Sequence, residues 1–366
     1  MVAENPRPFV IAVDVEPDAR LPDPREPTRW RGFEGLYPEM MRLRGVLAAR
    51  TGRPARFAWY WRADPQIEAI YGDPAWALRN YATEIAACLD AGDEIGLHVH
   101  AYRRDPEVAG GWVADHGDAR WIAHCVRQGF AAFADALGRP CRSFRMGDGW
   151  YAPWLLDLVA ELGAEIDLTI EPGWDPKTAL VEEEPHTGAL PDRRHEPTHP
   201  RAWRSERRAR GGGAGLHLLP VTTLRLPYGL TLGRWGHKLR GLSAAVEHSL
   251  DLAPLRAEPL LRLLPASWRR GPERSTLIWG MPDDVFSRLL DRALRGSRWP
   301  VVISVMRSDA GILEPQRTRL LATLERFARD ARTAQLAVVT PAETLARLGL
   351  SASPTTRAAA PAAARA

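Results

Sequence analysis

Short apolar runs alternate along the chain with longer stretches in which apolar residues recur every three or four positions. Residues 9–15 form the first apolar run, of β-strand length, and residues 38–50 follow with helical spacing that ends at Gly52 and Pro54. The same succession recurs. It predicts strands at 56–61, 94–100, 142–146, 166–170, 301–306 and 336–339, and helices at 78–91, 121–137, 153–162, 282–294 and 316–331. This alternation indicates β/α units around a parallel sheet.

Three stretches interrupt the alternation. Residues 171–215 are charged and rich in proline and glycine, which predicts an inserted loop or a partly disordered linker. Regular structure is expected to resume at 216–226, and residues 235–268 are typical of an arginine-rich helical insertion interrupted by prolines. Residues 351–366 contain Ala, Pro, Thr, Ser and Arg, with nothing to bury, and predict a disordered tail.

We therefore expect one α/β domain over residues 1–350, a distorted (β/α) barrel with an inserted loop and a helical insertion. The 366 residues exceed the usual size of one domain, but β/α barrels reach this length. Apolar residues make up 45% of the chain and charged residues 26%, as in an ordinary globular protein that can bury a full core.

Composition also bears on partners and location. The net charge of +4 comes largely from arginines at 193–210 and in the tail, and a solvated loop is a better interpretation of that run than a nucleic-acid surface. Cys88, Cys125 and Cys141 are odd in number and widely spaced, which indicates reduced thiols. The N-terminus lacks the apolar core of a signal peptide, and no apolar run could span a membrane. The expected location is cytoplasmic.

Two predicted strands end in pairs of polar residues two positions apart. Asp14 and Glu16 follow the first strand, and His98 and His100 close the third. Residues i and i+2 of a strand share a face, so each pair is presented together. The C-terminal strand ends of a β/α barrel meet on the face that carries active sites. Two imidazoles and a carboxylate, with positions left open for water, are the usual ligands of a hydrolytic zinc centre.

Both pairs also have an ordinary structural interpretation. Strand-end histidines can hydrogen-bond to the backbone, and an aspartate after a strand can form a turn that caps a helix. The position of both pairs at strand ends, on what should be one face of the sheet, favours a functional site.

Taken in order, these runs resemble the polysaccharide deacetylase family, the NodB-homology or carbohydrate esterase 4-like group, over residues 9–347. The resemblance is clearest to its intracellular Asp-Val-Glu type. The family motif Thr-Phe-Asp-Asp-Gly is similar to residues 12–16, which implies Asp14 as general base and either Glu16 or Asp14 as the carboxylate ligand. The motif His-Ser/Thr-x-x-His is similar to residues 98–102 and implies His98 as a ligand. Tyr102 stands at the second histidine, and His100 would replace it.

The later motifs imply further roles. Arg145, in residues 143–150, matches the arginine that orients the base, and Asp167 is similar to the aspartate of the fourth motif. Arg307 occupies the place of the general-acid histidine. An arginine cannot supply a proton near neutral pH, but it can stabilise an oxyanion or bind an acidic group. Candidate replacement acids are His116, His124 and His217.

The resemblance implies a metal-dependent hydrolase that removes an N-acetyl group from an amino sugar or polysaccharide precursor. Zinc would be held by His98, His100 and Glu16, and we expect Trp150 and Tyr102 to contact the carbohydrate. Two alternatives stay open. One is a non-catalytic carbohydrate-binding protein on the same fold. The other is a hydrolase of another small amide, such as a formyl-sugar or a cyclic ureide. The sequence leaves the oligomeric state open.

Overall fold

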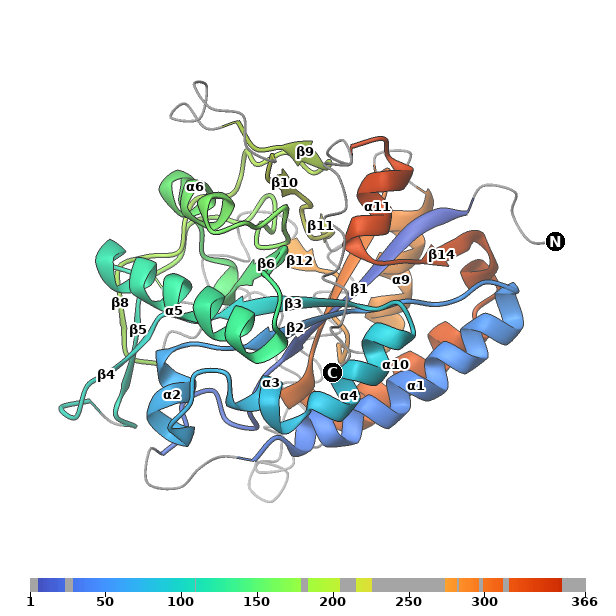
Figure 1. Ribbon diagram of the computed structural model, residues 1–366. Helices are drawn as coiled ribbons and strands as arrows, with labels where there is room; N and C mark the ends of the chain where they lie inside the picture. Colours follow the sequence, from blue (N-terminus) through green and yellow to red (C-terminus); the bar gives the residue numbers. More distant parts are fainter. Residues whose placement is uncertain are drawn as a thin grey trace, which may run out of the picture.

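The computed structural model describes residues 6–23, 29–108, 110–178, 184–204, 215–225, 274–281, 283–295, 299–311 and 316–350 (Figure 1). Its main sheet contains the strands β1 (Arg7–Val15), β2 (Ala58–Arg62), β3 (Glu94–Val99), β6 (Ser143–Met146), β7 (Ile166–Asp167), β9 (Arg201–Ala202), β10 (His217–Leu218), β13 (Val302–Arg307) and β14 (Leu336–Val338). Their order is β13-β1-β2-β3-β6-β7-β10-β9, and β14 pairs with β1. All pairs are parallel except β9 with β10.

The sheet curls until the segment that follows β10 reaches β13. The Thr222 amide donates a hydrogen bond to the carbonyl oxygen of Ile303 at 3.0 Å, and Thr222 Oγ1 accepts one from the Ile303 amide at 2.9 Å. A mostly parallel sheet that curls in this way is a distorted (β/α) barrel, so the predicted fold class is confirmed.

Two small sheets lie beside the barrel. One pairs β11 (Thr223–Arg225) with β12 (Arg274–Thr276), antiparallel, and the other contains β4 (Tyr102–Arg104), β5 (Trp112–Asp115) and β8 (His186–Thr187). The run predicted at 216–226 is therefore divided between β10 and β11.

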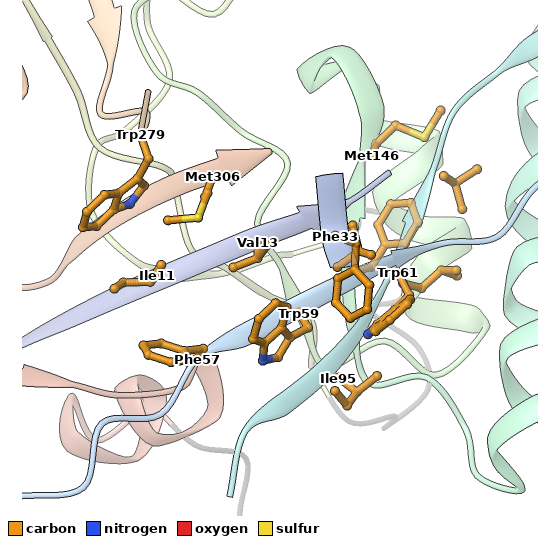
Figure 2. Packing of buried hydrophobic residues seen from close by; sticks show 14 of the residues in the cluster. Ile11, Val13, Phe33, Phe57, Trp59, Trp61, Ile95, Met146, Trp279 and Met306 are labelled. Atoms are coloured by element: carbon orange, nitrogen blue, oxygen red, sulfur yellow. The ribbon is translucent and has the colours of Figure 1, made fainter. Parts of the chain in front are cut away.

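Alternate residues of the central strands serve two separate cores. Ile11 and Val13 of β1 face outward and pack with side chains from β2 and the helices (Figure 2). Val10 and Ala12 face the barrel interior, in a cluster with Tyr60, Leu168, Leu219, Val221, Ile303 and Val305. Asp14 and Glu16 continue the Val10 and Ala12 face. The period of two therefore carries these carboxylates to the C-terminal mouth of the barrel interior.

The helices are α1 (Arg31–Thr51), α2 (Pro65–Tyr71), α3 (Trp76–Asn80), α4 (Ala82–Asp90), α5 (Ala119–Leu137), α6 (Pro153–Glu161), α9 (Asp283–Arg295), α10 (Gln316–Arg329) and α11 (Pro341–Arg347), with 3-10 helices η1 (Gly147–Gly149), η4 (Ser308–Gly311) and η5 (Ala331–Gln335). The helix predicted at 38–50 is the later part of α1. It starts earlier because Phe33 and Leu36 extend its buried face upstream of Pro38. The helix predicted at 78–91 is two helices, interrupted at Tyr81.

The remaining predictions concern segments at the margins. The helical insertion expected at 235–268 and the tail at 351–366 lie outside the described residues. The three cysteines are buried and unpaired. Among the helices that the structure describes, none combines the length and the apolar character needed to cross a membrane.

Candidate active site

Three side chains with metal-binding atoms converge at the C-terminal mouth of the barrel. Glu16 follows β1, His98 lies in β3 and His100 follows that strand, and their ligand atoms all lie within 4.8 Å of one another. The two Nε2 atoms are 3.0 Å apart; Glu16 Oε1 lies 3.6 Å from that of His98, and Glu16 Oε2 lies 3.6 Å from that of His100. The two same-face pairs are thus brought together across β2. One carboxylate and two imidazoles fit a zinc-like divalent ion.

His98 has the tautomer that a metal ligand needs. Its Nδ1 lies 2.9 Å from the carbonyl oxygen of Arg145. Because a carbonyl oxygen only accepts, the hydrogen-bond network assigns the proton to Nδ1. Nε2 then keeps a free lone pair on the side of Glu16 and His100. Such a hydrogen bond to the second nitrogen is the usual way in which proteins orient a ligating histidine.

The ring of His100 is fixed by its neighbours. Tyr102 stacks on it with centroids 5.2 Å apart and planes 8° from parallel. Gly147 packs so close that a Cβ there would lie 2.5 Å from three ring atoms, so only glycine fits. Burial and the Arg62 guanidinium lower the pKa of His100 to about 3. His100 is therefore neutral and able to ligate a metal at neutral pH.

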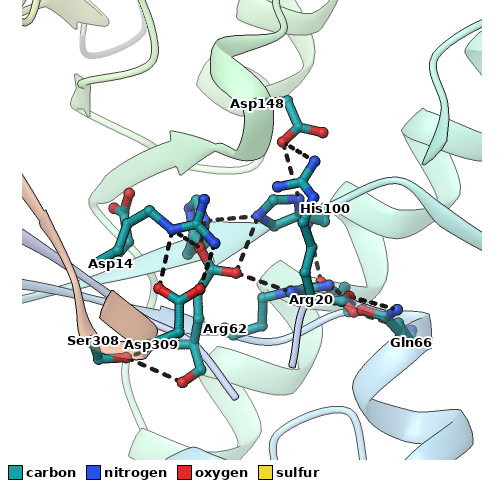
Figure 3. Close-up of polar contacts among 12 residues, drawn as sticks. Asp14, Arg20, Arg62, Gln66, His100, Asp148, Ser308 and Asp309 are labelled. Carbon is teal, nitrogen blue, oxygen red and sulfur yellow. Dashed lines mark hydrogen bonds and ion pairs between the residues drawn. The ribbon is translucent and has the colours of Figure 1, made fainter. Parts of the chain in front are cut away.

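Asp148 provides a carboxylate behind His100. Its Oδ1 lies 3.7 Å from His100 Nδ1, and Arg20 Nη2 donates to the same oxygen at 2.6 Å (Figure 3). Its φ of 58° is the only positive value among the described non-glycine residues. Burial alone raises the pKa of Asp148, but Arg20, His100 and His116 outweigh it and hold this pKa below its ordinary value. A carboxylate behind a ligating imidazole is a common supporting contact in metal sites.

Glu16 keeps its negative charge although it is buried. Burial raises its pKa, but the Arg307 guanidinium and both histidines outweigh that effect and hold the pKa well below its ordinary value. Arg62 Nη1 lies 3.3 Å from its Oε2. The Glu16 amide donates to Ser308 Oγ at 2.8 Å, which fixes the backbone at the strand end. The site thus holds an ionised carboxylate beside the neutral imidazole of His100.

Asp14 is oriented by Arg145. Arg145 Nε donates to both carboxylate oxygens at 3.0 and 3.1 Å, while its Nη1 donates to the carbonyl oxygen of Leu168 at 2.6 Å. Arg145 Nη2 lies 3.3 Å from Glu171 Oε1. The arginine is therefore held from three sides and fixes Asp14 beside the metal-binding cluster.

These groups line one cavity of about 510 Å³, a volume typical of small-molecule sites. Its walls include six of the residues predicted from sequence: Asp14, Glu16, His98, His100, Arg145 and Arg307.

Arg307 ends β13 directly beside Asp14 in the strand register. Its Nη2 donates to Asp309 Oδ2 at 2.6 Å, and its Nε lies 3.6 Å from Glu16 Oε1. Burial alone would lower the pKa of Arg307, but the Glu16 and Asp309 carboxylates outweigh burial and raise this pKa above its ordinary value. The side chain brings a permanent positive charge to the cavity.

Three predicted site residues are not among the residues that line the cavity. Asp167 accepts from the amide and hydroxyl of Thr169, at 2.9 Å each, and burial raises the pKa of Asp167 to about 6. Trp150 stacks on His116 and donates from Nε1 to the carbonyl oxygen of Ala189 at 3.2 Å. Tyr102 packs on His100. None of the three is among the residues that line the described cavity.

The histidines considered as replacement acids are also absent from the cavity lining. His116 Nε2 lies 3.5 Å from Asp148 Oδ2, on the far side of that carboxylate. His124 is exposed on α5, and His217 is buried in β10.

The segment predicted as an inserted loop contributes a wall of the cavity. Glu171, Trp174, Lys177 and Arg193 all line it. Two antiparallel stretches support them, with hydrogen bonds from the Arg193 amide to Trp174 O at 2.9 Å and from the Leu190 amide to Lys177 O at 2.7 Å. The arginine run at 193–210 was expected to be solvated. That expectation is wrong for Arg193, whose exposed fraction is 3%.

No family model and no curated protein matches this chain. Among solved structures, the chain is similar to a polysaccharide deacetylase described as putative from Mycobacterium smegmatis, at 13% identity and a TM-score of 0.44, over 98% of this chain and 96% of that one. It is also similar to a probable polysaccharide deacetylase from Pseudomonas aeruginosa, at 13% identity and a TM-score of 0.43, over 93% and 89%. An allantoinase gives 10% identity and a TM-score of 0.46, over 93% and 89%.

Polysaccharide deacetylases are thus among the solved structures that resemble this chain, and the sequence motifs resemble the same family.

Proposed function

We propose that the protein is a metal-dependent hydrolase that removes an N-acyl group, such as acetyl, from an amino sugar. The observation that carries this proposal is that one cavity contains both a metal-binding cluster and an oriented carboxylate. One is the Glu16, His98 and His100 cluster, whose ligand atoms converge. The other is Asp14, whose carboxylate is oriented by Arg145. Metal ligation and proton transfer are the two functions that hydrolysis of an amide by activated water requires.

The described residues divide the chemistry between them. A divalent ion held by Glu16, His98 and His100, zinc by its donor set, would lower the pKa of water and polarise the acyl carbonyl. Asp14 accepts the proton of the attacking water. Arg145 keeps that carboxylate in place, and Arg307 adds positive charge where the acyl oxygen becomes negative.

The leaving nitrogen also needs a proton. Arg307 cannot release one, and among the described cavity residues the only histidines are the two proposed ligands. Asp14 has just accepted a proton, so we assign the return of that proton to the same carboxyl group.

A sugar is favoured as the substrate by Trp174, a residue of the cavity wall, because apolar sugar faces pack on indole rings. The second candidate function is non-catalytic carbohydrate binding. The specific observation in its favour is Arg307, a residue that cannot act as the general acid, at the position where the family motif has a histidine.

Metal content and turnover together test the proposal. Purified protein is analysed for bound zinc and assayed for acetate release from N-acetylglucosamine and its short oligomers. We expect about one equivalent of metal in the wild type and a loss of metal in His98→Ala/His100→Ala. His124→Ala, an exposed histidine away from the cavity, is the matched control and should keep both metal and activity.

Asp14→Asn separates the two candidate functions. It should retain the metal and lose roughly 10²-fold or more of the turnover, because the carboxylate acts in proton transfer. Sugar binding without turnover in the wild type, unchanged by Asp14→Asn, would establish the binding protein instead. Equal metal content in the double variant and the wild type would contradict the ligand assignment.

A further inference from the structure

We propose that Arg193 recognises an anionic group, a carboxylate or a phosphate, carried by the substrate. This inference rests on the proposed function because it names the substrate class of the same cavity, an acylated sugar with a negative charge. The evidence is a comparison of the ion pairs that the arginines of the cavity form.

Arg193 is a buried cation without a carboxylate partner. It lines the cavity with an exposed fraction of 3%. Its Nη1 donates to the carbonyl oxygen of Gly149 at 3.0 Å, and its buried Nε has no acceptor. Among the described residues it forms no ion pair. A buried charge of this kind is costly unless it is compensated. An anionic group of a ligand would supply the negative charge and the hydrogen-bond acceptors that the protein does not place there.

The other arginines of the cavity are each paired with carboxylates. Arg20 pairs with Asp148 and Glu184. Arg145 pairs with Asp14 and Glu171, and Arg307 with Asp309 and Glu16. Three of the four guanidinium groups in the cavity wall therefore form ion pairs with carboxylates of the protein. Among the described residues Arg193 is the one cavity arginine with no carboxylate at ion-pair distance, although the charge of Glu171, which pairs with Arg145, raises the pKa of Arg193 against the effect of burial.

The fold holds Arg193 in this position through its backbone. The Arg193 amide donates to Trp174 O at 2.9 Å, and Arg193 O accepts from the Gly173 amide at 2.5 Å. Gly149 has a φ of 61°, and a Cβ at this position would collide with Arg193 Nη1. The guanidinium is thus fixed against the backbone of η1, on the segment that also carries the cavity tryptophan.

This arrangement suits one class of ligand. A planar guanidinium binds carboxylate or phosphate with paired N–H donors. Trp174, whose carbonyl oxygen accepts from the Arg193 amide, lines the same cavity and carries an indole on which a sugar ring can pack. A neutral acylated sugar would use the tryptophan alone, whereas an anionic one would use both.

Binding calorimetry on zinc-supplemented Asp14→Asn protein tests the inference without turnover. Three probes are compared: neutral N-acetylglucosamine, N-acetylglucosamine 6-phosphate and the carboxylate N-acetylmuramic acid. We expect at least one anionic probe to bind about 10- to 100-fold more tightly than the neutral sugar, as a charge-assisted hydrogen bond would give. Adding Arg193→Gln should abolish that advantage and leave the affinity for the neutral sugar unchanged. Arg193→Lys should retain part of it.

Arg194→Gln is the matched control. Arg194 is the adjacent residue, but its guanidinium is exposed and paired with Asp192, so the preference for the anion should persist in this variant. Preference for the phosphate or for the carboxylate identifies the group. Equal affinity for all three probes, no binding of either anionic probe at millimolar concentration, or an equal loss for all probes in Arg193→Gln would overturn the inference. Anion preference in a protein without turnover would refute only the proposed hydrolysis.

Discussion

At the scale of single residues, the same side-chain type carries different charge states according to what faces it. Glu16 and Asp148 are buried, yet nearby guanidinium and imidazole groups hold their pKa values below the ordinary range. Asp167 is equally buried but has only weak cationic compensation, so burial raises its pKa to about 6. Glu16 at the candidate metal centre is thus ready to bind a cation, whereas Asp167 holds a proton up to a higher pH than an ordinary aspartate.

This contrast predicts a pH-dependent stability difference for Asp167→Asn. The pKa of Asp167 is about 6 in the folded protein and near 4 in an unfolded chain. The folded state therefore binds the proton more tightly, and the wild type loses stability as the pH rises from about 4 to about 6. Asn cannot ionise, so the free energy of unfolding of the variant should rise relative to that of the wild type across that interval, by on the order of 2 kcal/mol.

Urea unfolding of both proteins at closely spaced pH values measures this difference. Other titrating groups are common to both chains and cancel. Parallel stability curves between pH 4 and pH 6 would show that Asp167 is not perturbed.

At the scale of elements, the sequence predicts most of what places the site. Strand-length apolar runs locate β1, β3 and β13, and the period of two then assigns Asp14, Glu16, His98 and His100 to the interior face. The short α2 was missed because seven residues are too few to show helical periodicity, although Asp64 and Pro65 form a recognisable helix start. The stacking of Tyr102 on His100 and of Trp150 on His116 could not be predicted, because strand and loop patterns do not reveal which aromatic rings pack together.

Asp64 links an element to the site and gives a second prediction. It caps α2 by accepting from the Gln66 and Ile67 amides, and it also accepts from the His100 amide at 3.0 Å and pairs with buried Arg62. Asp64→Ala removes the cap and leaves Arg62 with less compensation. We expect a loss of about 3–5 kcal/mol in the free energy of unfolding, together with weaker zinc binding.

Asp118→Ala provides the comparison for this variant. Asp118 caps α5 through the same pair of backbone contacts, but it is half-buried, pairs with Arg103 and lies outside the cavity lining. Its removal should cost less stability and leave the zinc affinity unchanged. Equal zinc affinity in Asp64→Ala and the wild type would show that Asp64 caps α2 without affecting the metal centre.

At the scale of the whole molecule, the site depends on contacts that no local pattern encodes. Arg193 meets the carbonyl of Gly149, and Glu171 meets Arg145, because the segment after β7 folds back over the mouth of the barrel. The sequence shows only that this segment is polar and rich in proline and glycine. Its role as a cavity wall follows from hydrogen bonds between residues 173–177 and 190–193, which depend on the fold as a whole.

The closing contact of the barrel is the whole-molecule feature most open to test. Thr222 is fully buried and its Oγ1 accepts from the Ile303 amide, so Thr222→Val keeps the shape but leaves that amide without its side-chain acceptor. We expect a loss of about 1–3 kcal/mol in the free energy of unfolding, and faster hydrogen exchange at Ile303. Thr344→Val is the matched control. Thr344 is equally buried, but its hydroxyl donates to the carbonyl oxygen of Thr340, the N-cap residue of α11, and the Thr344 amide also donates to that carbonyl. Its loss should stay below about 1 kcal/mol. Equal losses in the two variants, with Ile303 still protected, would mean that the barrel does not depend on Thr222 for its closure.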